Sequence, residues 1–212
     1  LIQDCKILEW NELESVITAM PTFFQASQQA GIEGRMIFDP KATNNYLTKE
    51  VAKLGWQSIP VPPNLTEFGT DWDGGKQSVL AEWQFSNYPF LWNNVIRTEA
   101  VYNARMQLPH VGEVSALVVV TKCGLFPSSN STLYYEQARA QLETVTDLGA
   151  FSIPIRLVGL SVPLGIEDIE AVWSTYPGRY ARHPDEQRVV RCRVIWGREM
   201  KYGTRSARFS LR

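Results

Sequence analysis

Two acidic side chains and a glutamine are spaced as a metal-dependent active site would space them. Asp73 begins a glycine-rich turn. Glu82 and Gln84 lie further along, on one face of a predicted strand, Val79–Phe85, because strand side chains alternate. Polar groups on a buried strand need partners. Two carboxylates that converge at a strand end form an oxygen site suited to Mg²⁺, which can polarise a phosphodiester and lower the pKa of water.

The spacing is similar to the PD-(D/E)xK nuclease pattern, in which one acid precedes a strand that carries acid-x-Lys. Here Gln84 stands at the Lys position and Trp72 at the Pro position. Taken alone the pattern is weak, and a surface strand with polar side chains explains it better. A longer similarity is needed to favour the nuclease interpretation.

Such a similarity is present, since several blocks resemble the BglII family of type II restriction endonucleases. It runs from about Ser15 to about His183 and fades beyond about Pro184. The blocks that carry it are Phe38–Pro40, Gly69–Lys76, Glu82–Asn94, Phe126–Gln137 and Ile153–Leu160.

The resemblance implies an α/β fold with a restriction-endonuclease-like core, a central mixed β-sheet flanked by helices, and a small β-rich subdomain. It implies a homodimer that encircles double-stranded DNA and cuts both strands with Mg²⁺, for which Mn²⁺ can substitute. The site would be a palindrome with a GATC core, of the AGATCT type. The resemblance further implies a cognate DNA methyltransferase in the same system. It also implies a cytoplasmic location in a bacterium or archaeon, with no membrane association.

The resemblance also assigns roles to residues around the acids. Asp73, Glu82 and the backbone carbonyl of Trp83 would bind the metal, and Glu82 would also orient the attacking water. Gln84 would hold that water, because an amide cannot accept a proton as a general base. Ser58, where the family has Asn, would support the active site.

The residues expected to contact DNA are the base readers and their supports, namely Ser86, Asn87, Asn130, Ser131, Arg97, Arg179 and Tyr180. Asn suits adenine and Arg suits guanine in the major groove. Local structural roles stay open as alternatives: a helix cap for Asn130–Ser131, a turn for Ser86–Asn87, an ion pair for Arg97 and ring packing for Tyr180. Gly178, where the family has Lys, leaves the outer base pair open.

The elements that must position these residues are indicated by hydrophobic spacing. Helices are predicted over 10–20, 44–54, 90–106 and 130–148, and strands over 79–85, 114–121 and 153–160. This alternation indicates an α/β fold with a largely buried sheet. Three prolines within Ile59–Asn64 exclude a central strand there.

Charge is uneven along the chain. The net charge is −1, but residues 176–212 carry 10 basic and 3 acidic side chains. Arg-rich segments suit phosphate, although a solvated strand face is the alternative. We interpret 1–212 as a single domain in which residues from about 165 to 212 form a basic β-rich DNA-binding subdomain, with strands added at the edge of the sheet.

Composition excludes several classes of protein. The 212 residues, 44% hydrophobic, are enough for a packed core, which argues against disorder and against a disulfide scaffold. No apolar run reaches the ~20 residues of a membrane span. Cys5, Cys123 and Cys192 are too far apart for a zinc site, and His110 and His183 lie outside the matched catalytic blocks. A DNA-binding protein that does not cut and a structure-selective repair nuclease remain the alternatives.

Overall fold

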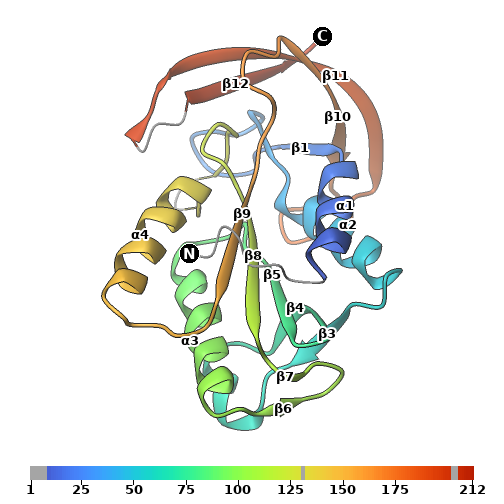
Figure 1. Ribbon diagram of the computed structural model, residues 1–212. Coiled ribbons are helices and arrows are strands. Elements are labelled where there is room, and N and C mark those ends of the chain that lie inside the picture. Colours follow the sequence, from blue (N-terminus) through green and yellow to red (C-terminus); the bar gives the residue numbers. More distant parts are fainter. Residues whose placement is uncertain (1–8, 130–131, 202–204) are drawn as a thin grey trace.

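The computed structural model describes residues 9–129, 132–201 and 205–212. Its centre is a five-stranded mixed sheet in the order β3-β4-β5-β8-β9 (Figure 1). β3, β4 and β5 are antiparallel neighbours, whereas β5, β8 and β9 run parallel. The strands are β3 (Gln57–Pro60), β4 (Asp71–Lys76), β5 (Val79–Trp83), β8 (Ala116–Lys122) and β9 (Ile155–Leu160).

Helices cover both faces of this sheet. α3 (Pro89–Asn103) and α4 (Tyr135–Asp147) pack on one face, and α1 (Trp10–Ala19) and α2 (Pro40–Ala52) lie on the other (Figure 1). The alternation of strand side chains explains how β8 serves both: its residues 116, 118 and 120 face the α1–α2 side, and 117 and 119 face α3 and α4. A continuous apolar strand is therefore required here, as the sequence predicted.

A second sheet, in the order β12-β11-β10-β1-β2, curves over one end of the central sheet (Figure 1). Its strands are β1 (Thr22–Ala26), β2 (Met36–Phe38), β10 (Asp168–Thr175), β11 (Glu186–Glu199) and β12 (Arg205–Leu211). The rings of Phe24, Phe126 and Phe209 pack together beneath it. The prediction that the basic tail extends the edge of the central sheet was wrong, because the tail belongs to this second sheet, which β10 joins to β1.

Two local predictions also need correction. The helix predicted over 44–54 begins earlier, at Pro40, because the Asp39 carboxylate accepts hydrogen bonds from the backbone N–H groups of Lys41 and Ala42. The expected glycine-rich turn at Asp73 is strand β4. The proline-rich segment does lie at an edge of the sheet, as β3 and then the 3₁₀ helix η1 (Pro63–Phe68). A small hairpin, β6 (Gln107–Leu108) and β7 (Gly112–Glu113), comes after α3.

Within the described part of the chain, no helix is both long and apolar enough to cross a membrane. Cys123 and Cys192 are free thiols. Cys5 lies outside the described residues.

Candidate active site

The antiparallel pairing of β4 with β5 brings the two predicted acids together. Gly74 lies opposite Ala81, so Asp73 on β4 is adjacent to Glu82 and Trp83 on β5. The Trp83 backbone N–H donates to Asp73 Oδ2 at 2.7 Å. Gly75 of β4 is needed for close packing against β3, because a Cβ there would overlap a side-chain carbon of Ile59.

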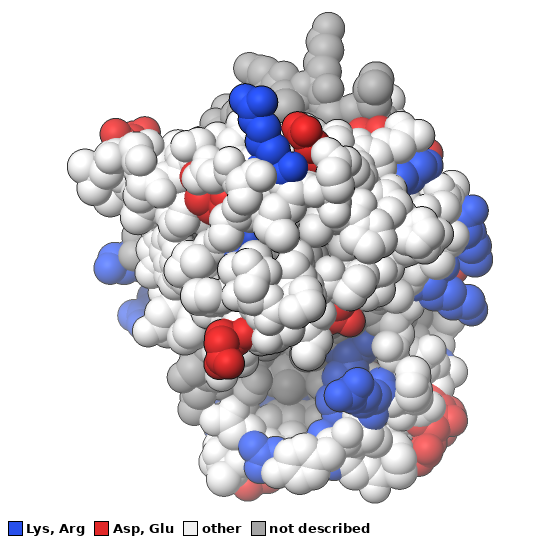
Figure 2. Space-filling view, turned by 90° about the horizontal axis from the view of Figure 1, so that it is seen from below, with Lys and Arg blue, Asp and Glu red and all other residues white. Residues whose placement is uncertain are grey.

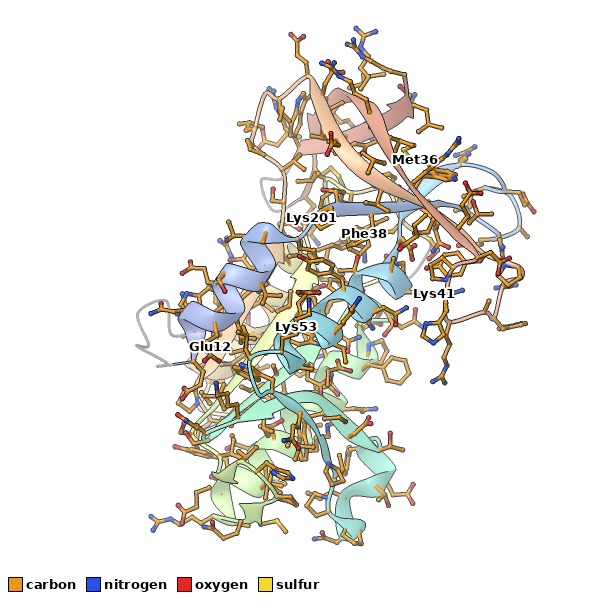
Figure 3. All side chains as sticks on the ribbon, turned by 90° about the vertical axis from the view of Figure 1, so that its right-hand side faces the viewer. Glu12, Met36, Phe38, Lys41, Lys53 and Lys201 are labelled. Atoms are coloured by element: carbon orange, nitrogen blue, oxygen red, sulfur yellow. The ribbon has the colours of Figure 1, made fainter. Side chains whose placement is uncertain are left out.

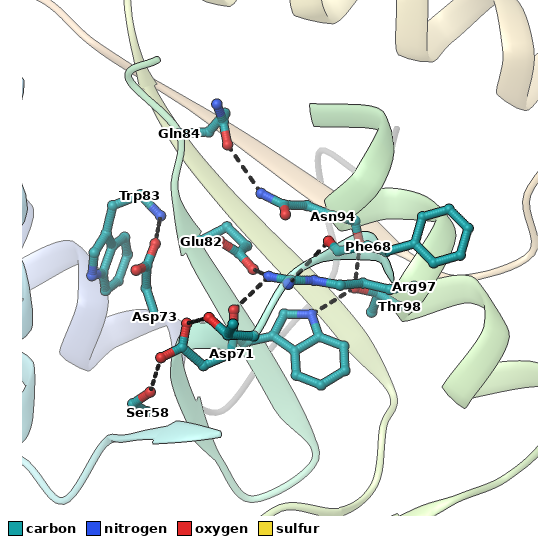
Figure 4. Close-up of polar contacts among 12 residues, drawn as sticks. Ser58, Phe68, Asp71, Asp73, Glu82, Trp83, Gln84, Asn94, Arg97 and Thr98 are labelled. Carbon is teal, nitrogen blue, oxygen red and sulfur yellow. Dashed lines mark hydrogen bonds and ion pairs between the residues drawn. The ribbon is translucent and has the colours of Figure 1, made fainter. Parts of the chain in front are cut away.

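Glu82 is held by an arginine that comes from α3. Glu82 and Arg97 are 5% and 3% exposed, and Arg97 Nη2 donates to Glu82 Oε1 (Figure 4). Arg97 Nη2 also donates to the backbone carbonyl of Asp71 at 2.7 Å, and its guanidinium lies 4.8 Å from the ring centre of Trp72. The Arg97 side chain is thus buried in an ion pair, the alternative that the sequence left open, and this position disfavours the direct contact with DNA that was expected of it.

The environment of the acids disfavours their ionised forms. Burial raises the pKa of Asp73 above its ordinary value. Burial and the adjacent charge of Asp73 raise the pKa of Glu82 well above its ordinary value, and Arg97 offsets only part of this. A buried and a half-buried carboxylate with a single arginine beside them leave a deficit of positive charge, which a divalent cation would fill.

This deficit predicts how stability depends on pH without divalent cations. A carboxyl group whose pKa is higher in the folded than in the unfolded state binds more protons when folded, so the free energy of unfolding falls as pH rises through the folded pKa. We expect Asp73→Asn to be stabilised relative to wild type at neutral pH, and less so near pH ~4. Urea unfolding in EDTA at both pH values measures the free energy of unfolding of the variant and of wild type. If the difference between the two proteins is the same at both pH values, the raised pKa of Asp73 is contradicted.

Gln84 is oriented by two neighbours. Its Oε1 accepts from Asn94 Nδ2 at 3.0 Å (Figure 4). Its Nε2 donates to Ser86 Oγ at 2.9 Å. Sequence reasoning did not identify Asn94. The sequence did contain a signal for it. The buried face of α3, which includes Leu91, also carries the polar side chains of Asn94, Arg97 and Thr98. A buried polar side chain needs a buried partner, so each of these residues pointed to one.

All three predicted catalytic residues line one open groove of about 490 Å³. Thr66–Asp71, Trp83, Ser86 and Asn94 contribute to its walls. Ser58 lies beside it, exposed, with its hydroxyl donating to Asp71 Oδ2 at 3.2 Å. The structure therefore brings the residues predicted for catalysis to one place and puts the predicted support residue next to them.

The oxygen atoms of this groove fit a hard divalent cation. Among the described residues no group of three His, Cys, Asp or Glu side chains could hold a metal ion, so side chains alone would not saturate it. The Trp83 carbonyl lies on the strand edge that faces Asp73, because a strand residue points its N–H and C=O to the same side. Asp73, Glu82 and this carbonyl are a donor set suited to Mg²⁺, with water or phosphate completing it.

The candidate base readers come directly after the catalytic strand. Ser86 and Asn87 are exposed, the Ser86 carbonyl accepts from Leu133 N at 2.9 Å, and Asn87 forms a β-bridge with Thr132. This pairing places Ser86–Asn87 beside Thr132 and Leu133. Asn130 and Ser131 themselves lie outside the described residues.

Lys122, which sequence reasoning missed, joins these two segments from beneath. It is 1% exposed, and its Nζ donates to the carbonyls of Leu133 at 3.0 Å and Phe85 at 3.4 Å. Burial lowers the pKa of Lys122 to about 8. A lysine within the apolar strand Ala116–Lys122 was the available signal, because a buried ammonium must find acceptors.

Arg179 and Tyr180 lie on an exposed loop beside a second groove of about 470 Å³, which Arg179, Asn87, Ser129 and Lys41 help to line. Tyr180 is 89% exposed, so the alternative of ring packing in the core is excluded. The face drawn in Figure 2 is hollowed, and Lys and Arg side chains line part of the hollow.

A mixed α/β sheet that carries an acid on one strand and acid-x-Gln on the next defines a nuclease core of the restriction-endonuclease type. The family model "Restriction endonuclease BglII/BglIII" matches residues 1–160, and the chain belongs to this family of type II site-specific deoxyribonucleases. The resemblance and the enzyme class inferred from the sequence are thereby confirmed.

Comparison with individual proteins gives the same result. The chain is 42% identical to the type II restriction enzyme BglII of Bacillus subtilis over 188 residues, which cover 88% of this chain and 83% of the relative. The crystal structure of BglII complexed with a DNA 16-mer matches with a TM-score of 0.88 at 37% identity, covering 98% of this chain and 94% of that one. The structure of free BglII matches with a TM-score of 0.68 at 33% identity, covering 94% and 91%.

Proposed function

We propose that this enzyme cuts double-stranded DNA with Mg²⁺ at a palindrome with a GATC core, of the AGATCT type. The observation that carries the proposal is the continuity of β5 with the segment directly after it: Glu82 and Gln84 line the acidic groove, and Ser86 and Asn87 emerge at its exposed end. One stretch of chain thus supports both hydrolysis and base recognition.

In the proposed mechanism Asp73, Glu82 and the Trp83 carbonyl would hold Mg²⁺, and the bound ion would supply positive charge near the scissile phosphate and lower the pKa of water. Arg97 keeps the Glu82 carboxylate in place through its buried ion pair. Gln84, oriented by Asn94, directs the attacking water by hydrogen bonding and takes no proton. In-line attack on phosphorus leaves a 5′-phosphate and a 3′-hydroxyl.

Recognition in this proposal uses side chains that the sequence assigned. Asn87 and Asn130 offer the paired donor and acceptor that adenine requires in the major groove, and Ser86 and Ser131 are their neighbours in the sequence. Arg179 and Tyr180 would meet the outer base pair. A palindromic site is read by two copies of one chain, so the enzyme acts as a homodimer, one active site per strand. A methyltransferase of the same specificity would protect the host DNA in the cytoplasm.

Digestion of unmethylated phage-length DNA with Mg²⁺, and then sequencing of the fragment ends, tests the proposal. We expect a single palindromic site with GATC at its centre, cutting with Mn²⁺ as well, and none with EDTA. Cuts without a shared sequence would refute the assigned base readers. Intact DNA together with tight binding to a GATC duplex would favour the alternative of a protein that binds and does not cut.

A further inference from the structure

The loop that carries Arg179 and Tyr180 is tied to the first turn of α2 by one lysine. Lys41 is labelled on α2 in Figure 3. Its Nζ donates to the carbonyl of Arg179 at 2.9 Å and to that of Ala181 at 2.7 Å. These two carbonyls flank Tyr180. Fixing both restricts the backbone that determines where the exposed Tyr180 side chain points.

Neighbouring side chains hold both ends of the same loop. Tyr176 donates its hydroxyl to Asp39 Oδ2 at 2.8 Å, and Asp39 is the buried N-cap of α2. Burial and the Asp39 charge raise the pKa of Tyr176, so this phenol remains a donor. Asn45 Nδ2 donates to the Arg182 carbonyl at 3.1 Å. The loop is therefore anchored before, at and after Tyr180.

The alternative role for Lys41 is direct attraction of a DNA phosphate. An ammonium has three donors, and two of those of Lys41 are used by the loop carbonyls. Its Nζ also lies 4.5 Å from the ring centre of Tyr176, a cation–π distance. Lys41 is thus held against the loop by three contacts, which leave one ammonium donor for any other partner.

We propose that Lys41 is a positioning residue for sequence specificity, which fixes the Arg179–Ala181 backbone so that Tyr180 and Arg179 meet the outer base pair of the site. The inference rests on the proposed function. It adds that Lys41, on α2, helps the enzyme to discriminate between DNA sites. Lys41 does so by positioning the loop of Arg179 and Tyr180, and it does not contact a base itself.

The test is a double-mutant cycle between Lys41→Met and Tyr180→Ala. The measured quantity is the ratio of kcat/KM for the cognate site to kcat/KM for a site with a changed outer base pair. One mismatched pair costs about 1–3 kcal/mol, so each single variant is expected to lower the ratio about tenfold. In the Tyr180→Ala background Lys41→Met should have a smaller effect than in wild type, because only Arg179 is then left for the fixed backbone to position. Lys49→Met, an exposed lysine of the same helix, is the matched control and should leave the ratio unchanged.

Salt dependence separates positioning from phosphate contact. We expect the slope of log affinity against log salt to be the same for Lys41→Met and wild type. The proposal would be overturned if Lys41→Met gave a shallower slope and lowered kcat/KM equally for the cognate and the changed site, with or without Tyr180→Ala. It would also be overturned if Lys41→Met left the ratio of the two kcat/KM values unchanged. If Lys41→Met does not fold, Asn45→Ala loosens the same loop and must lower the ratio. Failure of wild type to cut any GATC palindrome would instead refute the proposed function.

Discussion

Replacing Asp73 with Asn is expected to abolish DNA cleavage while leaving site-specific binding measurable. The amide oxygen introduced by Asp73→Asn could still accept the hydrogen bond from Trp83 N, so the β4–β5 geometry should survive. The substitution removes one of the two anionic donors that we propose for Mg²⁺. Because the metal contributes several kcal/mol to stabilising charge in the transition state, the single-turnover cleavage rate should fall by about a thousandfold or more.

The matched control lies two residues away on the same strand. Asp71 also lines the groove, but its backbone carbonyl and not its carboxylate contacts Arg97. Asp71→Asn removes the same charge from the same region and should change the cleavage rate only a few-fold. Equal losses for both variants would mean that general negative charge matters. Undiminished cutting by Asp73→Asn would exclude its role as a metal ligand.

Much of the fold could be predicted because its signals are local. The buried strand Ala116–Lys122 and the helix Pro89–Asn103 have the hydrophobic spacing of their class. Asp71–Lys76 could not be recognised as a strand, since its glycines have low β-propensity and it exists by pairing with β5. The parallel pairing of β1 with β10 joins Thr22 to Ala171, and nothing local encodes such a distant contact.

The residues of the candidate site also fall into those that the sequence could predict and those whose role depends on the fold. Asp73, Glu82 and Gln84 were predicted because the blocks of sequence around them resemble the BglII family, whereas their spacing alone is a weak signal. Arg97 was assigned to DNA from the resemblance. Its ion pair with Glu82 could not be predicted locally, because only the fold brings the two side chains together. Its position on the apolar face of α3, one residue before the buried Thr98, favoured an internal partner. A charged residue on a buried helix face is better interpreted first as one half of a buried pair.

The Arg97–Glu82 pair leads to the largest expected effect on stability. Breaking a buried ion pair by removing one partner costs about 3–5 kcal/mol, because it leaves an uncompensated buried charge. Arg97→Met would also leave the Asp71 and Phe68 carbonyls without its guanidinium. We therefore expect a loss of about 3–5 kcal/mol in the free energy of unfolding, or roughly 10 °C in Tm, measured by urea and thermal unfolding at neutral pH.

A second substitution shows whether the cost comes from the orphaned charge. In Arg97→Met, Glu82→Gln the stranded carboxylate becomes a neutral amide, so the double variant should be more stable than Arg97→Met alone. The control for losing any arginine is Arg139→Met, whose exposed side chain is 3.7 Å from Glu143 on α4 and which should cost less than ~0.5 kcal/mol. If the double variant is less stable than Arg97→Met, the arginine acts through packing on Trp72 and the two carbonyls. If the double variant recovers stability but does not cleave DNA, then the Arg97–Glu82 ion pair serves catalysis. Its role would be to keep Glu82 ionised at a buried position where a neutral side chain would be more stable.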